Sequence, residues 1–132
     1  MDVFVYGTLT DPDRVGEVLH SYVFVGPATL RGLHAVDGEY PTLAPGGEVA
    51  GRLLRTDERD RLDEYERVAD GLYTRVVVPI TAGHDSVADE AVVYAGDPDA
   101  LDADATWPGS GSFADRVATY VTDESVCVDP QW

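Results

Sequence analysis

The chain opens with the apolar run Val3-Phe4-Val5-Tyr6-Gly7-Thr8-Leu9, which has the pattern of a short strand entering a turn. Its β-branched and aromatic residues predict the strand, and Gly7 predicts the turn. A helix is expected directly afterwards, because Asp11 is a suitable N-cap and Pro12 a suitable first helical residue. A turn between a buried strand and a helix can direct its backbone N–H groups into a cavity, where they would hold an anion or a carbonyl oxygen.

The rest of the chain predicts more strands than helices. Strands are expected over residues 22–36, 49–54, 72–81 and 86–95, the last two joined as a hairpin by Ala82-Gly83-His84-Asp85. Helices are expected over residues 11–21, 57–69 and 113–121, and irregular segments over 34–45 and 96–112, which are rich in Gly and Pro. The pattern predicts a single α+β domain over residues 1–132, built on a small, mostly antiparallel or mixed β-barrel or sheet flanked by helices.

The acidic composition narrows the classes of partner. The chain has a formal net charge of −16, and its nine basic residues are all arginines. The carboxylates repel one another over a Debye length of about 10 Å in dilute salt, but over only about 3 Å in molar salt. We therefore expect a protein of a high-salt, halophilic cytoplasm, and the alternative is an acidic protein of an ordinary cytoplasm. The arginines are interleaved with acids, which argues against nucleic acid, and no apolar stretch predicts a membrane span or a signal peptide.

One carboxylate is predicted to face inward. On a helix over residues 57–69, a step of 100° per residue places Leu62, Tyr65 and Glu66 in one sector, whereas Asp63 and Arg67 point elsewhere. A carboxylate on an apolar face is costly unless it is paired or hydrogen-bonded, and desolvation raises its pKa towards values that suit a general base. Glu66 is therefore either a candidate base or a residue paired at the rim of the core.

The remaining reactive residue types do not predict a metal site. His20, His34 and His84 are scattered along the sequence, and none stands at metal-ligand spacing from a cysteine or carboxylate. The one cysteine, Cys127, has no second cysteine with which to form an internal disulfide, and we interpret it as structural. These residues therefore predict no metal site.

Five short motifs occur in a fixed order over residues 1–95: Val3-Phe4-Val5-Tyr6-Gly7-Thr8-Leu9, Tyr40-Pro41, Val49-Ala50-Gly51, Leu62-Asp63-Glu64-Tyr65-Glu66 and Tyr73-Thr74-Arg75. Together they resemble the gamma-glutamylcyclotransferase-like (AIG2-like) family. The most diagnostic parts are the Tyr-Gly-Thr-Leu turn and the Leu-Asp-x-x-Glu end of the helix. The resemblance does not extend to residues 96–132, which are divergent.

The resemblance implies a β-barrel with flanking helices, a substrate cavity beside the turn, and a catalytic glutamate that matches Glu66. The substrate-binding positions that it implies are Tyr6, Gly7, Thr8, Leu9 and Tyr73. The implied enzyme is a cofactor-independent cyclotransferase, of the acyltransferase or cyclising lyase type. It converts a γ-glutamyl amino acid or γ-glutamylamine into 5-oxoproline and a free amine. Neither the identity of the amine nor the oligomeric state follows from the sequence.

One residue departs from the family pattern. The family usually has glycine directly after the catalytic glutamate, whereas Arg67 follows Glu66 in this chain. The arginine either pairs with Glu66 and lowers the pKa of its carboxyl, or stays on the solvent side as the helical wheel indicates. Two alternatives to an enzyme stay open: a small-ligand binding module of the same fold, and an interaction protein in which Glu66 belongs to a buried salt bridge.

Overall fold

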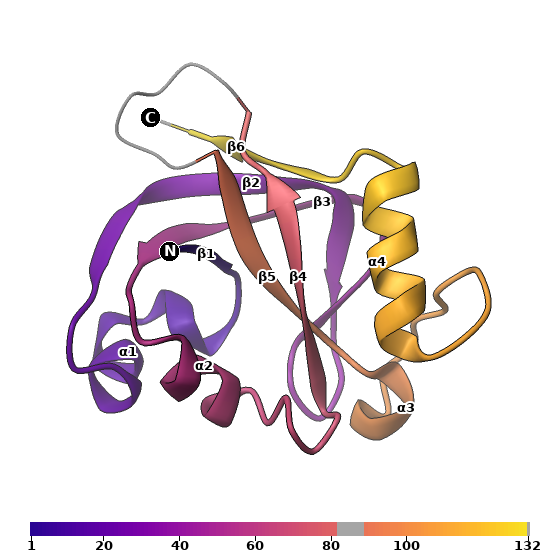
Figure 1. Ribbon diagram of the computed structural model, residues 1–132, viewed down its shortest axis with the longest axis horizontal. Helices are drawn as coiled ribbons and strands as arrows, with labels where there is room; N and C mark the ends of the chain where they lie inside the picture. Colours follow the sequence, from indigo (N-terminus) through magenta and orange to yellow (C-terminus); the bar gives the residue numbers. More distant parts are fainter. Residues whose placement is uncertain (82–88, 132) are drawn as a thin grey trace.

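The computed structural model describes residues 1–81 and 89–131, which form a curled sheet with helices around it (Figure 1). The strands are β1 (Asp2–Val5), β2 (Val23–Val36), β3 (Thr42–Arg55), β4 (Tyr73–Pro79), β5 (Glu90–Gly96) and β6 (Cys127–Pro130). The helices are the 3-10 turn η1 (Thr8–Thr10), α1 (Pro12–Val18), α2 (Arg59–Tyr65), α3 (Pro98–Leu101) and α4 (Phe113–Asp123). The predicted hairpin turn at residues 82–85 lies outside the described residues.

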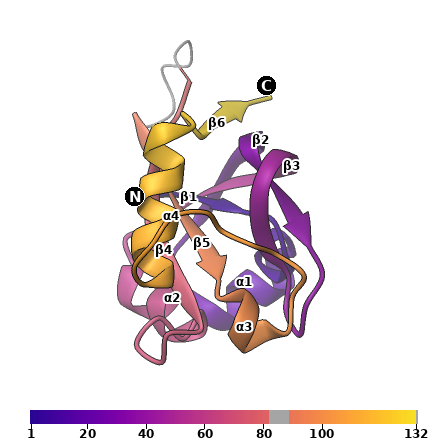
Figure 2. The same cartoon turned by 90° about the vertical axis from the view of Figure 1, so that its right-hand side faces the viewer.

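The six strands form one mixed sheet in the order β4-β5-β1-β3-β2-β6. β1 is antiparallel to β3 and parallel to β5, and the other neighbouring strands in this order are antiparallel. The two edges of the sheet curl towards each other and meet at a bridge between Ile80 and Val128, where the Thr81 N–H donates to the Val128 carbonyl at 2.8 Å. Helix α4 packs against β4 beside this half-barrel (Figure 2). The expected small mixed barrel with flanking helices is therefore confirmed.

Strand β1 is buried on both of its faces. Phe4 points into the curl and packs in the main apolar cluster. Val3 and Val5 point to the opposite face and pack in a second cluster with Val15 of α1 and Leu62 of α2. Because alternate residues of a strand face opposite sides, the continuous apolar run needs a core on each side of β1. The strand thus fixes the position of the turn that follows it.

Strand β3 approaches β1 closely at one glycine. A Cβ atom on Gly51 would collide with the carbonyl oxygen of Val5 and with the ring of Phe4. Only glycine leaves the backbone free to come this near. The Val49-Ala50-Gly51 motif therefore has a packing reason, since it allows β3 to lie against the strand that leads into the turn.

The predicted irregular segment over residues 34–45 is wrong at both of its ends. β2 continues to Val36 and β3 already begins at Thr42. The two strands pair with each other in a long hairpin that ends at Val36 and Thr42. Pro45 is accommodated opposite Leu33, directly after a shift of register in the ladder. A proline cannot donate a ladder hydrogen bond, so it is tolerated at such an irregularity. The irregular connection is confined to residues 37–41.

The helices of the described residues are short, and α4 with 11 residues is the longest of them. None of them has the length and apolar composition needed to cross a membrane. The first helix was predicted over residues 11–21 but ends at Val18, while its predicted N-cap is confirmed because the Asp11 carboxylate accepts from the Asp13 N–H at 3.0 Å.

The C-terminal segment adds two elements that the sequence analysis missed. α3 lies within the predicted loop over residues 96–112, and β6 pairs with β2 in the register Ala28↔Pro130. Cys127 belongs to β6 and is a half-buried free thiol. The helix expected over residues 113–121 is present as α4, capped by the Ser112 hydroxyl, which accepts from the Asp115 N–H. α3 and β6 have only four residues each, which is too few for their periodicity to be recognised in a sequence.

Candidate active site

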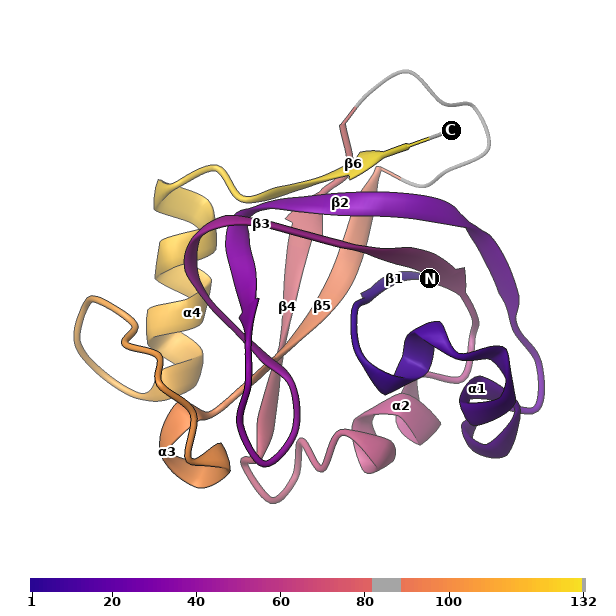
Figure 3. The same ribbon diagram turned by 180° about the vertical axis from the view of Figure 1, so that it is seen from behind.

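A cavity of about 330 Å³ lies between the turn after β1, the helices α1 and α2, and the strands β4 and β5. The two helices lie side by side below the end of β1 (Figures 1 and 3). The lining residues are Phe4, Val5, Tyr6, Gly7, Thr8, Leu9, Arg14, Tyr40, Pro41, Tyr65, Glu66, Arg67, Leu72, Tyr73 and Tyr94. The volume is in the range that small-molecule sites occupy.

The turn after β1 contributes backbone donors to this cavity. It forms a 3-10 turn in which the Thr10 N–H and the Thr10 hydroxyl both donate to the Gly7 carbonyl, at 3.1 Å and 2.7 Å. Within residues 1–81 and 89–131, the N–H groups of Gly7, Thr8 and Leu9 donate to no acceptor. Unpaired backbone N–H groups beside a cavity are suited to bind an oxyanion or a carboxylate.

Helix α2 ends one residue before Glu66, not at residue 69 as predicted. Glu66 is the C-cap residue, and Arg67 adopts a left-handed conformation with φ of 53°. The Arg67 N–H donates to the Glu64 carbonyl at 3.1 Å, and the Val68 N–H to the Asp63 carbonyl at 3.0 Å. This pair of bonds is the Schellman motif, whose left-handed position glycine fills without strain. The usual family glycine thus has a conformational reason, and Arg67 meets the same requirement at a steric cost.

The Glu66 carboxylate stands at the cavity without a compensating charge. Within the described segments, no side chain or backbone group forms a hydrogen bond or ion pair with it. Desolvation by burial raises its pKa to about 7. Arg67 does not neutralise it, because the Arg67 Nε donates to Asp70 Oδ2 at 3.1 Å and the Arg67 side chain is 58% exposed. Of the two positions open to Arg67, the structure shows the solvent side.

Three tyrosines surround Glu66. Burial raises the pKa of the Tyr6, Tyr73 and Tyr94 phenols, and the Glu66 carboxylate raises each of them further. The Tyr6 hydroxyl donates to the Tyr94 carbonyl at 2.7 Å, and the Tyr73 hydroxyl donates to the Pro41 carbonyl at 2.6 Å. These bonds hold the rings in place, so the cavity has a rigid wall of phenols that stay protonated at neutral pH.

Asp63 ties α2 to the sheet behind Glu66. Its carboxylate accepts from the Tyr94 hydroxyl at 2.7 Å and from the guanidinium of Arg75, and it forms an ion pair with Arg59 at 3.7 Å. The nearby cations are therefore engaged by Asp63. A further bond of 2.8 Å joins the Thr8 and Tyr65 hydroxyls and connects the turn to α2.

The cavity brings together all the residues selected from the sequence, and which of them contact a substrate stays a prediction. Tyr6, Gly7, Thr8, Leu9, Glu66 and Tyr73 all line it, although the Leu9 side chain is 4% exposed and packs in the second core cluster. His34 is not among the lining residues, and its Nδ1 lies 2.9 Å from the Gly46 carbonyl oxygen. His84 lies outside the described residues.

Sequence reasoning assigned no role to several residues of the site. Asp63 and Tyr65 stood in a recognised motif and could have been selected from it. Tyr94 and Arg14 gave no such signal, because they reach the cavity only through the pairing of β4 with β5 and the placement of α1.

The fold and the cavity define a class of small curled-sheet proteins in which a desolvated carboxylate and the turn after the first strand line the same cavity. The chain belongs to the gamma-glutamyl cyclotransferase, AIG2-like, family, whose model matches residues 3–114. The resemblance noted in the sequence is thus confirmed, and the match extends beyond residue 95 into α4.

Relatives and solved structures agree with this assignment. AIG2-like proteins A and C of Arabidopsis thaliana are 36% and 39% identical, over 60% and 51% of this chain. The chain spans about half the length of these relatives, 51% and 44%. A solved gamma-glutamyl cyclotransferase covers 74% of this chain and 66% of its own, with a TM-score of 0.59 and 21% identity, which shows a shared fold. An Arabidopsis thaliana solution structure covers 93% and 84%, with a TM-score of 0.54 and 28% identity.

The left-handed conformation of Arg67 leads to a testable prediction. Arg67→Gly is expected to raise the free energy of unfolding by about 1 kcal/mol, because glycine takes this conformation without a Cβ clash and the exposed pair with Asp70 contributes little. Urea unfolding followed by circular dichroism measures the change.

Ser125→Gly is the matched control, since Ser125 also has a positive φ, 52°, and is not among the cavity-lining residues. It should stabilise the fold to a similar degree. A lower stability of Arg67→Gly, with Ser125→Gly stabilised, would contradict this reading of the helix end.

Proposed function

We propose that the chain is a cyclotransferase that converts a γ-glutamyl amino acid or γ-glutamylamine into 5-oxoproline and a free amine. One observation carries the proposal: the carboxylate of Glu66, with a pKa of about 7, shares a cavity with the N–H groups of the Gly7 to Leu9 turn, which donate to no acceptor in residues 1–81 and 89–131. Family membership supports this reaction class, and the geometry is consistent with a role for each group.

Glu66 acts as the general base in the first step. A free α-amino group has a pKa of about 8, so at neutral pH most of it is protonated and cannot attack. A carboxylate with a pKa of about 7 is matched to this proton far better than an ordinary glutamate. Removal of the proton frees the nitrogen lone pair, which attacks the γ-carbonyl carbon of the same molecule and forms the C–N bond of the five-membered ring.

The turn stabilises the charge that this attack creates. The carbonyl π electrons move to its oxygen, and fixed backbone N–H donors contribute on the order of 3 kcal/mol to stabilising such an oxyanion. The same donors are equally suited to the α-carboxylate of the substrate. Collapse of the tetrahedral intermediate breaks the bond to the leaving amine, and Glu66 gives its proton to that nitrogen. The Glu66 carboxylate then takes the second proton of the ring nitrogen, which leaves 5-oxoproline with a neutral amide N–H. The departing amine accepts this proton in turn, and Glu66 is again a carboxylate.

The cavity also contributes to catalysis by positioning the substrate. Nucleophile and electrophile belong to one molecule, so the cavity has to hold the γ-glutamyl chain curled, which is a proximity effect. The hydrogen-bonded rings of Tyr6 and Tyr73 supply a rigid wall for this purpose. Every step uses protein groups and substrate, and the mechanism requires no metal or cofactor.

Replacing the base tests the mechanism. Glu66→Gln is expected to lower 5-oxoproline release by at least about 100-fold, because an amide cannot accept the proton. The fold should persist, since the amide removes a buried charge. The measurement is product formation from a panel of γ-glutamyl compounds in molar KCl, with circular dichroism as the check on folding.

Glu64→Gln is the matched control, an exposed carboxylate of the same helix that does not line the cavity. It should retain the activity of the unaltered chain. Activity preserved in Glu66→Gln would remove Glu66 from the mechanism, whereas ligand binding without any product would favour a binding module.

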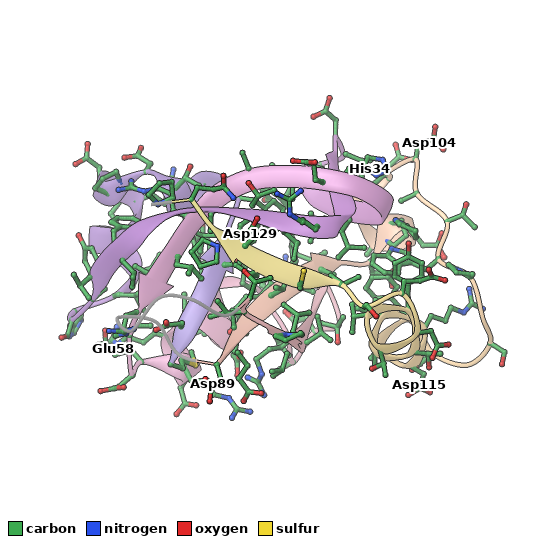
Figure 4. The ribbon with its side chains drawn as sticks, turned by 90° about the horizontal axis from the view of Figure 1, so that it is seen from above. His34, Glu58, Asp89, Asp104, Asp115 and Asp129 are labelled. Carbon is green, nitrogen blue, oxygen red and sulfur yellow. The ribbon has the colours of Figure 1, made fainter. Side chains whose placement is uncertain are left out.

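We further propose that the protein works in a high-salt cytoplasm. The sequence contains 25 acidic residues and nine arginines. The acids are spread over separate parts of the molecule, as Glu58, Asp104 and Asp115 illustrate (Figure 4). Their mutual repulsion opposes folding in dilute salt and is screened in molar salt.

The free energy of unfolding is therefore expected to rise steeply as KCl increases from dilute to molar. Thermal unfolding at a series of KCl concentrations measures the effect. Neutralising the exposed Asp89 and Asp104 to asparagine should weaken the dependence. A free energy of unfolding independent of KCl would contradict the proposal.

A further inference from the structure

The cavity carries little charge of its own. Of its lining residues, only Arg14, Glu66 and Arg67 are charged. Glu66 has the role of base, which leaves two cations beside the reacting groups. In the molar salt proposed above, charges interact over only about 3 Å, so the net charge of −16 has little effect on a distant substrate. A cation in direct contact with the substrate is therefore the one that can attract an anionic group.

The two arginines differ in their availability. Arg67 is hydrogen-bonded to Asp70 at 3.1 Å across its own turn. Among the described residues, Arg14 has one partner, an ion pair with Glu17 at 3.4 Å, and both side chains are exposed, at 49% and 68%. Such exposed pairs at i,i+3 are weak and exchange readily. Arg14 is therefore the cation that can change partner when a ligand enters.

Arg14 is also placed close to the turn by short-range structure. Helix α1 begins at Pro12. The preceding residue, Asp11, accepts from the Asp13 N–H with its carboxylate and donates its own N–H to the Thr8 carbonyl. The second core cluster holds Val15, the next residue, with Leu9. The backbone at Arg14 is thus fixed relative to the turn, while its guanidinium remains partly in solvent.

With the γ-carbonyl oxygen or the α-carboxylate at the turn donors, the leaving nitrogen stays within reach of Glu66, which protonates it. The group attached to that nitrogen then extends to the open side of the cavity. Arg14 lines the cavity with a side chain that is 49% exposed, and is a cation at that margin. An amino acid leaving group carries a carboxylate at that end, which a guanidinium binds with two parallel hydrogen bonds. A simple amine offers no partner to the arginine.

We propose that Arg14 binds the carboxylate of the leaving group, so that the enzyme prefers γ-glutamyl amino acids to γ-glutamylamines. This inference rests on the proposed cyclotransferase function and narrows its substrate class. It makes Arg14 a specificity-determining residue with no part in proton transfer.

Two substrates that differ only in the carboxylate test the proposal: γ-glutamylalanine and γ-glutamylethylamide. The unaltered chain should have the higher kcat/KM on γ-glutamylalanine. Arg14→Gln is expected to lower kcat/KM on this substrate by about tenfold, mainly through KM, because a hydrogen-bonded ion pair is lost. The loss of kcat/KM on γ-glutamylethylamide should be much smaller, because this substrate offers the arginine no carboxylate. Arg14→Lys should restore part of the preference.

Arg61→Gln is the matched control, because Arg61 is an arginine with 47% exposure that pairs with Glu58 and does not line the cavity. It should alter neither kcat/KM. An equal loss on both substrates in Arg14→Gln, or no loss on either, would overturn the role of Arg14 while leaving the cyclotransferase function standing. Absence of 5-oxoproline from both substrates with the unaltered chain would overturn the proposed function, and the specificity with it.

Discussion

The site depends on a carboxylate that is desolvated and has no hydrogen-bond or ion-pair partner within the part of the chain that the structure describes. Glu66 follows the last residue of α2, where the Schellman turn directs the chain away and Arg67 is bonded to Asp70. Asp63, one turn earlier, engages Arg75 and Arg59. If Arg67, Arg75 or Arg59 paired with Glu66 instead, the pKa of the Glu66 carboxyl would fall and the carboxylate would be a weaker base. The ion pairs of α2 are therefore as important to the proposed chemistry as the base itself.

A second constraint fixes the position of the turn that carries the N–H donors. β1 is buried on both faces and lies close to β3 at Gly51, so the turn that follows it is fixed by two apolar clusters. The bond between the Thr8 and Tyr65 hydroxyls, 2.8 Å long, links that turn to α2. Donors and base thus sit on separate elements that are held together by packing and by direct hydrogen bonds, which is the preorganisation that electrostatic catalysis needs.

Much of this arrangement could be predicted from local patterns. The strand and turn at residues 3–9 were recognisable from β-branched residues and a glycine, and the inward position of Glu66 followed from helical periodicity. The end of α2 could not be predicted, because arginine rarely adopts a left-handed conformation and gives no signal of a helix end. The early start of β3 was hidden by Pro45 and two glycines, and Tyr94 reaches the site only through long-range strand pairing.

The titration of Glu66 tests the central claim most directly. Carbon-13 labelling of glutamate side chains, with Glu66→Gln used to assign the resonance, reports the protonation of this carboxyl by NMR in the folded protein. The desolvated and unpaired site described above predicts a midpoint of about 7. A midpoint near the ordinary value of 4.5 would mean that the carboxylate is solvated or paired, and would contradict its assignment as the base.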